Sequence, residues 1–277
     1  MISLLQVQKF RGKMGDNMAE KNYLHTAYAN SADGTDGFTT VYPNLNLLDG
    51  TKDFSGNWTN ASSWVTDGTY KGLTVKKRTN QWGGIYKTFT APKDGVYTFS
   101  AYVKSSGDTA GIYRLIFKNG VNVLLPNKFL GNNFDWLRDS FSITLGAGDV
   151  MDTRYEISGS APDTILWTAG HKWEEGSTAT PHMQSASEVT TADWPKYVGT
   201  YVDTNQTSST EPSKYDWNEM KYRVYLDGVP VGGSKLLSFD LENLKAGTSY
   251  NVQVSQINGN VESDKSESIA FKTTLPK

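Results

Sequence analysis

The sequence has no cysteine, no excess of basic residues and no long apolar run. Without cysteine the chain has neither a disulfide framework nor a thiol nucleophile, which predicts synthesis in a reducing cytoplasm or in a lineage that avoids disulfides. The net charge of −2, from 27 basic and 29 acidic residues, argues against nucleic acid as a partner. Because no segment approaches about 18 consecutive apolar residues, we expect no membrane-spanning helix.

Residues 1–19 are interpreted as an N-terminal tail. Their apolar run is too short for a signal peptide, and no small-residue cleavage site follows it. The apolar residues suit a docking strand or a helix turn: Ile2, Leu4, Leu5, Val7 and Phe10. The alternative is that translation begins at Met14 or Met18, in which case residues 1–17 are not native. Both interpretations stay open.

The chain is rich in aromatic residues and glycine, with 8 Trp, 15 Tyr and 26 Gly. This composition, with a mean hydropathy of −0.50, favours an all-β protein over a helical enzyme. From residue 45 to residue 188, alternating segments of strand length follow one another, separated by Gly, Asn and Asp turns. One of them ends in Asn119-Gly120, a strong hairpin signal. The pattern predicts a jelly-roll β-sandwich over residues 45–188.

A short sequence occurs twice, once on each side of this predicted sandwich. The copies run from Asn22 to Phe38 and from Lys196 to Trp217. Each alternates aromatic or aliphatic residues and then becomes polar, which is typical of a strand followed by a loop. We therefore predict a small β platform, made of residues 20–44 and 189–219, into which the sandwich is inserted.

Residues 220–277 form a further set of short alternating strands. The run from Leu244 to Tyr250 (LKAGTSY) has the spacing of a tyrosine corner, in which a Tyr hydroxyl bonds to upstream backbone at the edge of a sandwich. The region resembles the second half of a fibronectin type III domain, although Ala246 replaces the usual Pro of that family. The resemblance predicts a fibronectin type III-like domain here.

Several stretches resemble tail proteins of Gram-positive siphophages. Residues 169–188 (AGHKWEEGSTATPHMQSASE) resemble the closing strand of the carbohydrate-binding modules in such proteins. Residues 46–58 resemble the opening strand of these modules, and residues 78–104 resemble the central hairpin. The two repeated segments resemble a pair that brackets such modules in baseplate and host-specificity proteins. The implied family is an accessory baseplate or tail-tip adhesion protein of a lactococcal-type siphophage.

This resemblance implies a place in the virion, at the tail tip or baseplate, after synthesis in the host cytoplasm. It further implies host cell-wall polysaccharide and other baseplate or tail proteins as partners, with several copies per virion. The lack of a long apolar run predicts no membrane contact. We expect a non-catalytic component that binds host cell-surface polysaccharide and so assists adsorption. The alternatives are a purely architectural spacer without glycan binding, and a bacterial surface adhesin or ancillary module of a cell-wall hydrolase.

A saccharide site needs flat aromatic rings for the C–H face of the sugar and polar side chains for its hydroxyls. The segment from Arg78 to Tyr86 (RTNQWGGIY) has both. Trp82 and Tyr86 are four residues apart, so in a regular strand they share one face with Arg78. Asn80 joins that face if the strand starts early enough. We predict a stacking platform here; the alternative is a core Trp beside a Gly-Gly bulge.

Two further aromatic residues complete the predicted carbohydrate site. Tyr113 is opposite in phase to Ile112, and Arg114 faces the other way from Tyr113. Trp136 follows a polar loop (GNNFD), where a rim aromatic and a core residue have the same pattern. The predicted binding residues are Arg78, Asn80, Trp82, Tyr86, Tyr113 and Trp136.

The remaining tryptophans of this region are assigned by their flanking sequence. Trp58 and Trp64 flank an Asn/Ser-rich loop and are candidates for a second rim patch. Trp167 and Trp173 lie in the predicted closing strand, where hydrophobic residues are expected, so we assign both to the core.

A structural Ca²⁺ is common in the module class that the chain resembles. Asp49, Asp53 and Glu174 are the available oxygen donors, and a hard cation needs about six or more ligands. The closing strand reads TAG at residues 168–170, where related modules often have acidic residues. We therefore predict no metal and no cofactor, with a structural Ca²⁺ as the alternative.

Residue types that support catalysis are sparse. The three histidines have no metal-ligand spacing, and no Gly-x-Ser-x-Gly motif is present. Glu174 and Glu175 are adjacent in a predicted strand, so they point to opposite faces and do not flank one glycosidic bond. We predict that the protein is not an enzyme.

Overall fold

The computed structural model describes residues 21–123, 127–159 and 163–274, so the predicted N-terminal tail lies outside the described residues. They form β-strands and three 3₁₀ turns, Ala61–Ser63, Thr191–Asp193 and Pro212–Lys214, and no α-helix. The prediction of an all-β protein is confirmed. Within the described part of the chain, no helix is long and apolar enough to span a bilayer.

The chain divides into two compact units. The inserted unit is Pro43–Val189, and the flanking unit comprises the described parts of Met1–Tyr42 and Thr190–Lys277. Each unit is described by itself below. The finer division of the flanking unit into a platform and a fibronectin type III-like domain stays a prediction.

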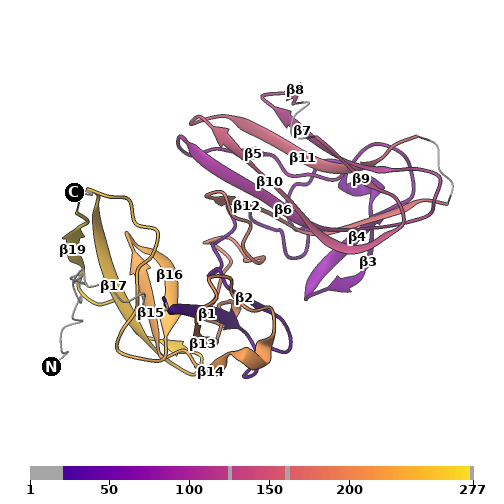
Figure 1. Cartoon of the computed structure of the whole chain (residues 1–277). Coiled ribbons are helices and arrows are strands. Elements are labelled where there is room, and N and C mark those ends of the chain that lie inside the picture. Colours follow the sequence, from indigo (N-terminus) through magenta and orange to yellow (C-terminus); the bar gives the residue numbers. More distant parts are fainter. Residues whose placement is uncertain (1–20, 124–126, 160–162, 275–277) are drawn as a thin grey trace. The chain divides into compact units, whose positions relative to one another are not determined.

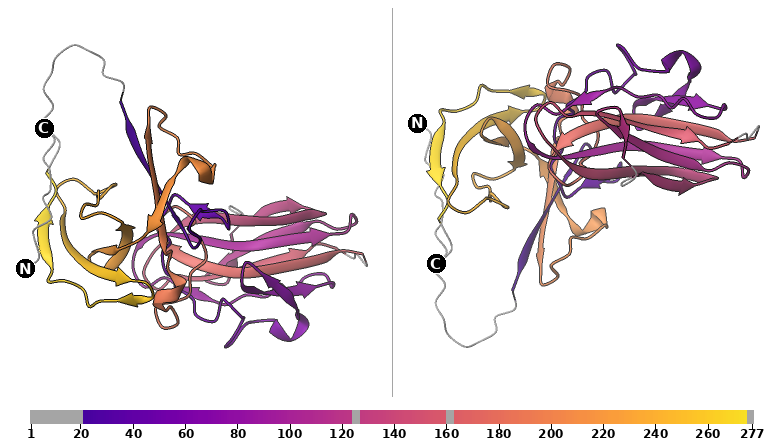
Figure 2. Two further views of the ribbon diagram at one scale, coloured as in Figure 1. Left: turned by 90° about the horizontal axis from the view of Figure 1, so that it is seen from below. Right: turned by 90° about the horizontal axis from the view of Figure 1, so that it is seen from above.

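The inserted unit is a jelly-roll-like sandwich of two five-stranded sheets (Figure 1). The β6 sheet has, in spatial order, β10 (Phe134–Leu145), β6 (Gly95–Ser106), β12 (Ile165–Glu175), β4 (Leu73–Arg78) and β3 (Val65–Tyr70). The β7 sheet has β5 (Phe89–Thr90), β11 (Val150–Ile157), β7 (Ile112–Lys118) and β8 (Val121–Asn122), with β9 (Lys128–Gly131) also paired to β7. The long strands of the unit are stacked in layers in Figure 2.

Alternation along the strands produces the core between these two sheets. On β6, Tyr97, Phe99, Ala101 and Val103 are all buried and are two residues apart. Successive side chains of a strand point to opposite faces, so these four share the inner face. Trp173 of β12 is fully buried and belongs to the same core, as predicted from its place in the closing strand.

The predicted Asn-Gly turn joins β7 to β8. Asn119 has φ 52° and Gly120 has φ 78°, both in the left-handed region. A type I′ turn needs positive φ at both central residues, which Asn and Gly adopt at low cost. This turn therefore sets the register between Phe117 and Asn122.

In the flanking unit, the two copies of the repeated sequence are neighbouring strands of one sheet. β1 (Tyr23–Ala29) pairs antiparallel with β13 (Tyr197–Asp203), in register from Tyr23 opposite Asp203 to Ala29 opposite Tyr197. β14 (Asp216–Glu219) and β2 (Phe38–Thr39) complete this four-stranded sheet. Strands with the same alternating pattern thus become partners although about one domain's length of chain lies between them.

The last strands of the chain form one five-stranded sheet. Its members are β16 (Val229–Ser234), β15 (Tyr222–Leu226), β17 (Ser249–Asn258) and β18 (Val261–Glu262), with β19 (Ile269–Lys272) also paired to β17. The Tyr250 hydroxyl accepts a hydrogen bond from the backbone N–H of Lys245 at 3.0 Å, as a tyrosine corner requires. The likeness to a fibronectin type III domain beyond this sheet stays a prediction.

Candidate functional site

Trp82 lies in a loop and not in a strand. β4 ends at Arg78, and residues 79–84 form an irregular segment in which Trp82 has φ 55° and Gly83 has φ 63°. Two successive left-handed residues break the alternation, so the prediction that Arg78, Trp82 and Tyr86 share a strand face is wrong. The alternative of a core Trp is also wrong, because 49% of the Trp82 side chain is exposed.

The loop that carries Trp82 is held firmly against β11. The Trp82 backbone N–H donates to the carbonyl of Ile157 at 3.1 Å. A Cβ on Gly84 would lie 2.4 Å from the carbonyl oxygen of Tyr155, so only glycine allows this close approach. The exposed ring of Trp82 is therefore presented from a fixed backbone.

Arg78 braces this loop from the inside. Its guanidinium donates to the carbonyls of Asn80 at 2.9 Å, Gln81 at 3.2 Å and Ser63 at 3.2 Å. Burial lowers the pKa of Arg78, and the nearby charge of Glu156 opposes that shift. Two of its N–H groups thus bond to the loop and a third bonds to Ser63, while the side chain of Asn80 is exposed.

The outer face of the β7 sheet carries the predicted residue Tyr113 beside Phe129. Tyr113 is opposite Glu156 on β11 and opposite Phe129 on β9. Residues directly opposite in antiparallel strands place their side chains on the same face. The Tyr113 and Phe129 rings are 5.0 Å apart, with 36% and 57% of their side chains exposed.

Tyr113 has the predicted phase in its strand. Ile112 is fully buried in the core. Arg114 also faces the interior, where its guanidinium donates to the buried carboxylate of Asp139 at 2.7 Å. Tyr113 between them therefore faces outward.

An arginine and a glutamate lie between the rings of this face. The Arg154 guanidinium is 4.3 Å from the ring centre of Phe117 and 5.3 Å from that of Tyr86. Its Nε donates to Glu156 at 2.6 Å, and Glu156 also accepts from the backbone N–H of Gly84. Stacking and this ion pair hold the guanidinium in one orientation.

We call this set the outer aromatic surface: Trp82, Tyr86, Tyr113, Phe117, Phe129, Arg154 and Glu156. Three of its members were predicted from sequence, namely Trp82, Tyr86 and Tyr113. Arg154 and Glu156 were missed, although the alternation of Asp152, Arg154 and Glu156 in the sequence DTRYE marks one polar face of a strand. Phe129 had no local signal, because only its pairing with Tyr113 places it here.

Trp136 does not belong to this surface. It lies on β10 in the other sheet and stacks on Tyr70, with ring centres 4.3 Å apart and planes 12° apart. These rings pack with Tyr102 and Trp167 against a small second cluster of Leu73, Val75 and Ala169. The six predicted residues therefore do not form one site.

Three other tryptophan assignments change. Trp58 and Trp64 are buried, so the predicted second rim patch is wrong. Their indole N–H groups donate to backbone carbonyls, at Ser55 and Gly83 respectively, which turns the rings inward. Trp167 is only partly buried, and its indole donates to Asp67 at 2.7 Å, so its assignment to the core is also wrong.

The oxygen donors considered for Ca²⁺ have other partners. Asp49 pairs with Lys87, and Asp53 accepts from the backbone N–H of Ser55 at 2.9 Å. Glu174 is fully buried and lies 3.2 Å from the Lys172 ammonium, whose pKa burial lowers to about 8 against the opposing effect of Glu174. Among the described residues, no cluster of three or more His, Asp or Glu is suited to a metal. The prediction of no cofactor stays a prediction.

One side-chain arrangement has the connectivity of a Ser-His-Asp triad. His25 Nδ1 is 3.1 Å from Ser208 Oγ, and His25 Nε2 is 3.1 Å from Asp203 Oδ1 and 2.8 Å from the carbonyl of Asn205. The Asp203 carboxylate also accepts from the backbone N–H of Asn205, and the His25 ring stacks on Tyr201. We interpret the histidine as a clamp that holds the loop of residues 203–208 to β1.

Comparison with known proteins identifies the family. The family described as "Minor structural protein 5-like, C-terminal domain" matches residues 195–253. A chain in the structure of the tripod (BppUct-A-L) from the baseplate of bacteriophage Tuc2009 is 48% identical, with a TM-score of 0.70 over 94% of this chain and 100% of that chain.

More distant structures align with parts of the chain. The CBM22-1 xylan-binding domain of Paenibacillus barcinonensis Xyn10C is 15% identical, with a TM-score of 0.37 over 50% of this chain and 99% of that one. A family 35 carbohydrate-binding module from Clostridium thermocellum is 16% identical, with a TM-score of 0.32 over 41% of this chain and 89% of that one. No curated protein matches. From its identity to the Tuc2009 chain over nearly its whole length, this chain belongs to that family of phage baseplate proteins, which are components of the virion tail.

Proposed function

We propose that this baseplate protein binds host cell-surface polysaccharide, without catalysing a reaction on it, and thereby assists adsorption. The observation that carries the proposal is the outer aromatic surface. Trp82, Tyr113 and Phe129 expose flat rings, which is costly in water unless something covers them. The C–H face of a pyranose is such a cover.

The polar members of the surface match the remaining needs of a sugar. Arg154 has donors for hydroxyl oxygens, and Glu156, which is buried, holds the Arg154 guanidinium in place. Because stacking and the ion pair already orient Arg154, little further side-chain entropy is lost when a ligand binds. The surface is therefore suited to recognising sugar hydroxyls without large rearrangement.

A shallow site of this kind binds one sugar chain weakly. Several copies on one virion would bind neighbouring chains of the same wall, and linkage of this kind raises the apparent affinity by about 10²–10⁴. The proposal therefore includes several copies per virion and attachment to other baseplate proteins. The net charge of −2 is consistent with a role that involves no nucleic acid.

The test is binding of the full-length chain to host cells and to a glycan array, compared with Trp82→Ala and Phe129→Ala. We expect each substitution to weaken binding about tenfold, because each removes one stacking ring. Val65→Ala is the control, since Val65 is an exposed residue of the other sheet. Equal binding by all four chains would contradict the proposal.

The rival function is a purely architectural one, and the exposed Phe129 ring also favours it. Aromatic side chains are enriched at protein interfaces, so the same rings suit another baseplate protein. In that case neither the unaltered chain nor its variants bind glycan, while Phe129→Ala weakens capture of a baseplate protein from the same phage.

A further inference from the structure

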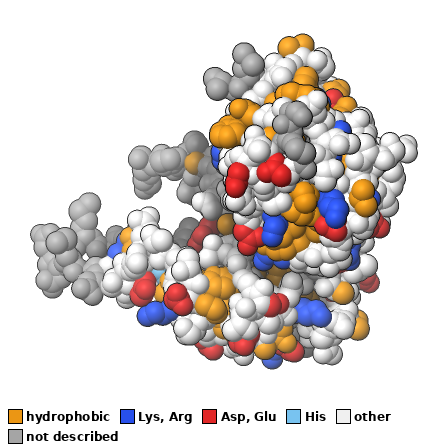
Figure 3. Space-filling view, turned by 90° about the vertical axis from the view of Figure 1, so that its right-hand side faces the viewer, with side chains coloured by type: hydrophobic (Ala, Val, Ile, Leu, Met, Phe, Trp, Pro, Cys, Tyr) orange, Lys and Arg blue, Asp and Glu red, His pale blue; other side chains and the backbone are white. Residues whose placement is uncertain are grey.

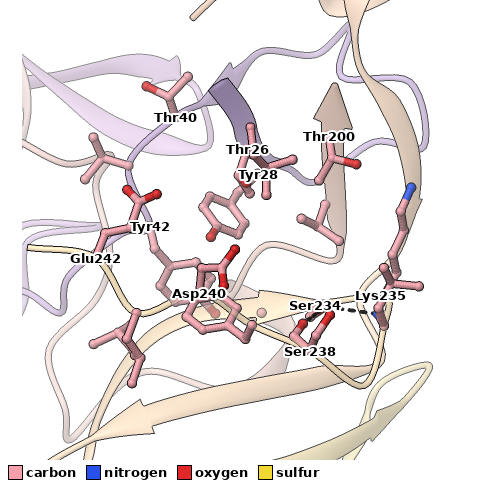
Figure 4. A pocket seen from close by; sticks show the side chains of 18 of the residues that line it. Thr26, Tyr28, Thr40, Tyr42, Thr200, Ser234, Lys235, Ser238, Asp240 and Glu242 are labelled. Atoms are coloured by element: carbon pink, nitrogen blue, oxygen red, sulfur yellow. Dashed lines mark hydrogen bonds between the residues drawn. The ribbon is translucent and has the colours of Figure 1, made fainter. Parts of the chain in front are cut away.

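The flanking unit contains a cavity of about 450 Å³. β1, β13, β16 and the segment of residues 235–243 all contribute side chains to its wall (Figure 4). Its volume is within the range of about 300–1,000 Å³ that is typical of small-molecule sites. It lies outside the inserted unit, so it is separate from the outer aromatic surface.

Hydroxyl groups and carboxylates line much of this cavity. The hydroxyl-bearing residues include Thr26, Thr40, Thr200, Ser208 and Ser238, and the carboxylates are Asp240 and Glu242. The lining also includes Lys235, but its ammonium is paired with Asp216 at 2.8 Å. The charge presented to a ligand is therefore negative.

Tyr28 has a hydroxyl that no described residue satisfies. The Tyr28 side chain is 6% exposed and lines the cavity, and its hydroxyl is open to that space and makes no hydrogen bond with another described residue. Burial raises the pKa of Tyr28, and Tyr42 and Glu242 add to the shift, so the hydroxyl stays protonated and able to donate. Figure 4 shows Tyr28, Tyr42, Asp240 and Glu242 around the same space.

Tyr42 is a useful contrast within the same cavity. Its hydroxyl accepts a hydrogen bond from Arg223 Nε at 3.0 Å, so it already has a protein partner. The Tyr28 hydroxyl has no such protein partner and is open to the cavity, so it is the donor that is available to a ligand oxygen.

We propose that this cavity binds one amine-bearing saccharide unit. The ammonium pairs with Asp240 and Glu242, and a ring or hydroxyl oxygen accepts from Tyr28. Hydroxyl groups of the wall bond to the sugar hydroxyls, and apolar side chains such as Leu24 and Phe239 contact its C–H groups. A phosphorylated or acidic sugar is disfavoured, because the carboxylates repel it.

A lysine side chain of a partner protein is the other cation that suits two carboxylates. It has one polar end and an apolar stem, so it leaves most hydroxyls of the wall without partners. A polyhydroxylated ligand uses the carboxylates and the hydroxyls together, which is why the observations favour a sugar.

The experiment is a calorimetric or NMR titration of the full-length chain with glucosamine, N-acetylglucosamine and glucose 6-phosphate. We expect glucosamine to bind best, N-acetylglucosamine to bind about tenfold more weakly and the phosphate to show no binding. Tyr28→Phe keeps the ring and should weaken glucosamine binding several-fold. Asp240→Asn combined with Glu242→Gln should abolish the preference for the amine.

Two control variants separate this site from the rest of the protein. Trp82→Ala should leave glucosamine binding unchanged, since Trp82 lies in the inserted unit, and Asp264→Asn removes an exposed carboxylate that does not line the cavity. The proposal is overturned if glucosamine does not bind up to its solubility limit, or if it binds Tyr28→Phe and the double variant as well as the unaltered chain. Binding of a lysine-rich peptide in place of glucosamine also overturns it.

Discussion

The two units of the chain distribute their hydrophobic side chains differently. The largest fully buried side chains of the described residues all belong to the inserted unit: Trp173, Tyr97, Tyr155, Phe99, Lys172, Ile85, Ile112, Ile116, Leu145, Met151, Ile157 and Leu166. The exposed large hydrophobic residues of that unit include three aromatic ones, Trp82, Tyr113 and Phe129, beside the aliphatic Leu47, Val65, Val96 and Val121. Those of the flanking unit are all aliphatic: Leu24, Val41, Val202, Val229, Leu236, Leu237, Val261 and Ile269.

This difference separates two kinds of surface. Flat rings can stack on the C–H face of a sugar, whereas branched aliphatic side chains have no flat face for such stacking. Figure 3 shows exposed hydrophobic side chains in patches beside charged ones on one face of the molecule. We infer that the inserted unit exposes rings beside its own complete core, while the flanking unit keeps aliphatic residues outside its cavity, such as Leu237, for a neighbouring chain.

The largest expected effect is on the core of the inserted unit. Trp173 is fully buried and stacks on Phe89, with ring centres 4.8 Å apart. We expect Trp173→Ala to lower the free energy of unfolding of this unit by about 3–5 kcal/mol, because the closely packed neighbours of Trp173 relax only partly into the cavity that it leaves. Trp194→Ala, in the flanking unit, is the matched control and should cost less. Urea denaturation followed by tryptophan fluorescence measures both, and an equal or smaller loss for Trp173→Ala would refute the contrast in core packing.

Acid should destabilise the inserted unit through two histidines. Burial lowers the pKa values of His171 and His182 to about 3, from an unfolded value near 6.5. As the pH falls, these histidines therefore take up protons first in the unfolded chain. The stability that their neutral buried forms give the folded unit is complete above about pH 6.5 and is lost as the pH falls toward 3. Between pH 6.5 and 4.5 the loss is about 2–3 kcal/mol for the fully buried His171 and less for the partly exposed His182, since one pKa unit corresponds to about 1.4 kcal/mol.

The measurement is the urea midpoint of the inserted unit at pH 7 and at pH 4.5, for the unaltered chain and for His182→Gln. The amide retains a polar partner for Thr51, to which His182 Nε2 is hydrogen-bonded at 2.9 Å, but does not titrate in this range. The variant should therefore lose less stability on acidification. An identical pH dependence for both chains would show that His182 does not contribute.

A third effect tests how Arg154 is held. Arg154→Lys keeps the positive charge but loses the planar group that stacks between Phe117 and Tyr86. If the outer aromatic surface binds glycan as proposed, we expect a several-fold loss of affinity with a change in stability of about 1 kcal/mol or less. Glycan-array titration and thermal unfolding of the same samples measure both quantities. Unchanged affinity would remove Arg154 from the proposed site.

The sequence was sufficient to predict an all-β fold because strand alternation is local. The alternation along β6 placed Tyr97, Phe99, Ala101 and Val103 on one face, and the repeated segments that predicted a platform are the paired strands β1 and β13. Tyr113 likewise has the outward phase that its strand pattern predicted.

The site was predicted less well because it depends on loop geometry and on pairing between distant segments. Trp82 does not lie on the expected strand face because Trp82 and Gly83 both have positive φ, which the periodicity of the sequence does not reveal. Phe129 reaches Tyr113 only through the pairing of β9 with β7. Trp64 turned inward because its indole donates to the carbonyl of Gly83, a contact between segments that sequence spacing does not encode.

The smallest effect on stability concerns the aliphatic surface of the flanking unit. Leu237 is 75% exposed, so Leu237→Ser should change the free energy of unfolding by about 0.5 kcal/mol or less. If a neighbouring baseplate chain covers this residue, its burial contributes about 1.5–3 kcal/mol to assembly, and the variant should be incorporated into virions at least tenfold less well. Val121→Ser is the control, because Val121 is similarly exposed but lies in the inserted unit. Competition of the two variants during phage assembly, followed by mass spectrometry of purified virions, measures incorporation. Equal incorporation would mean that the exposed aliphatic residues around Leu237 stay in water, and the division between a ligand-binding unit and a protein-binding unit would then lose its main support.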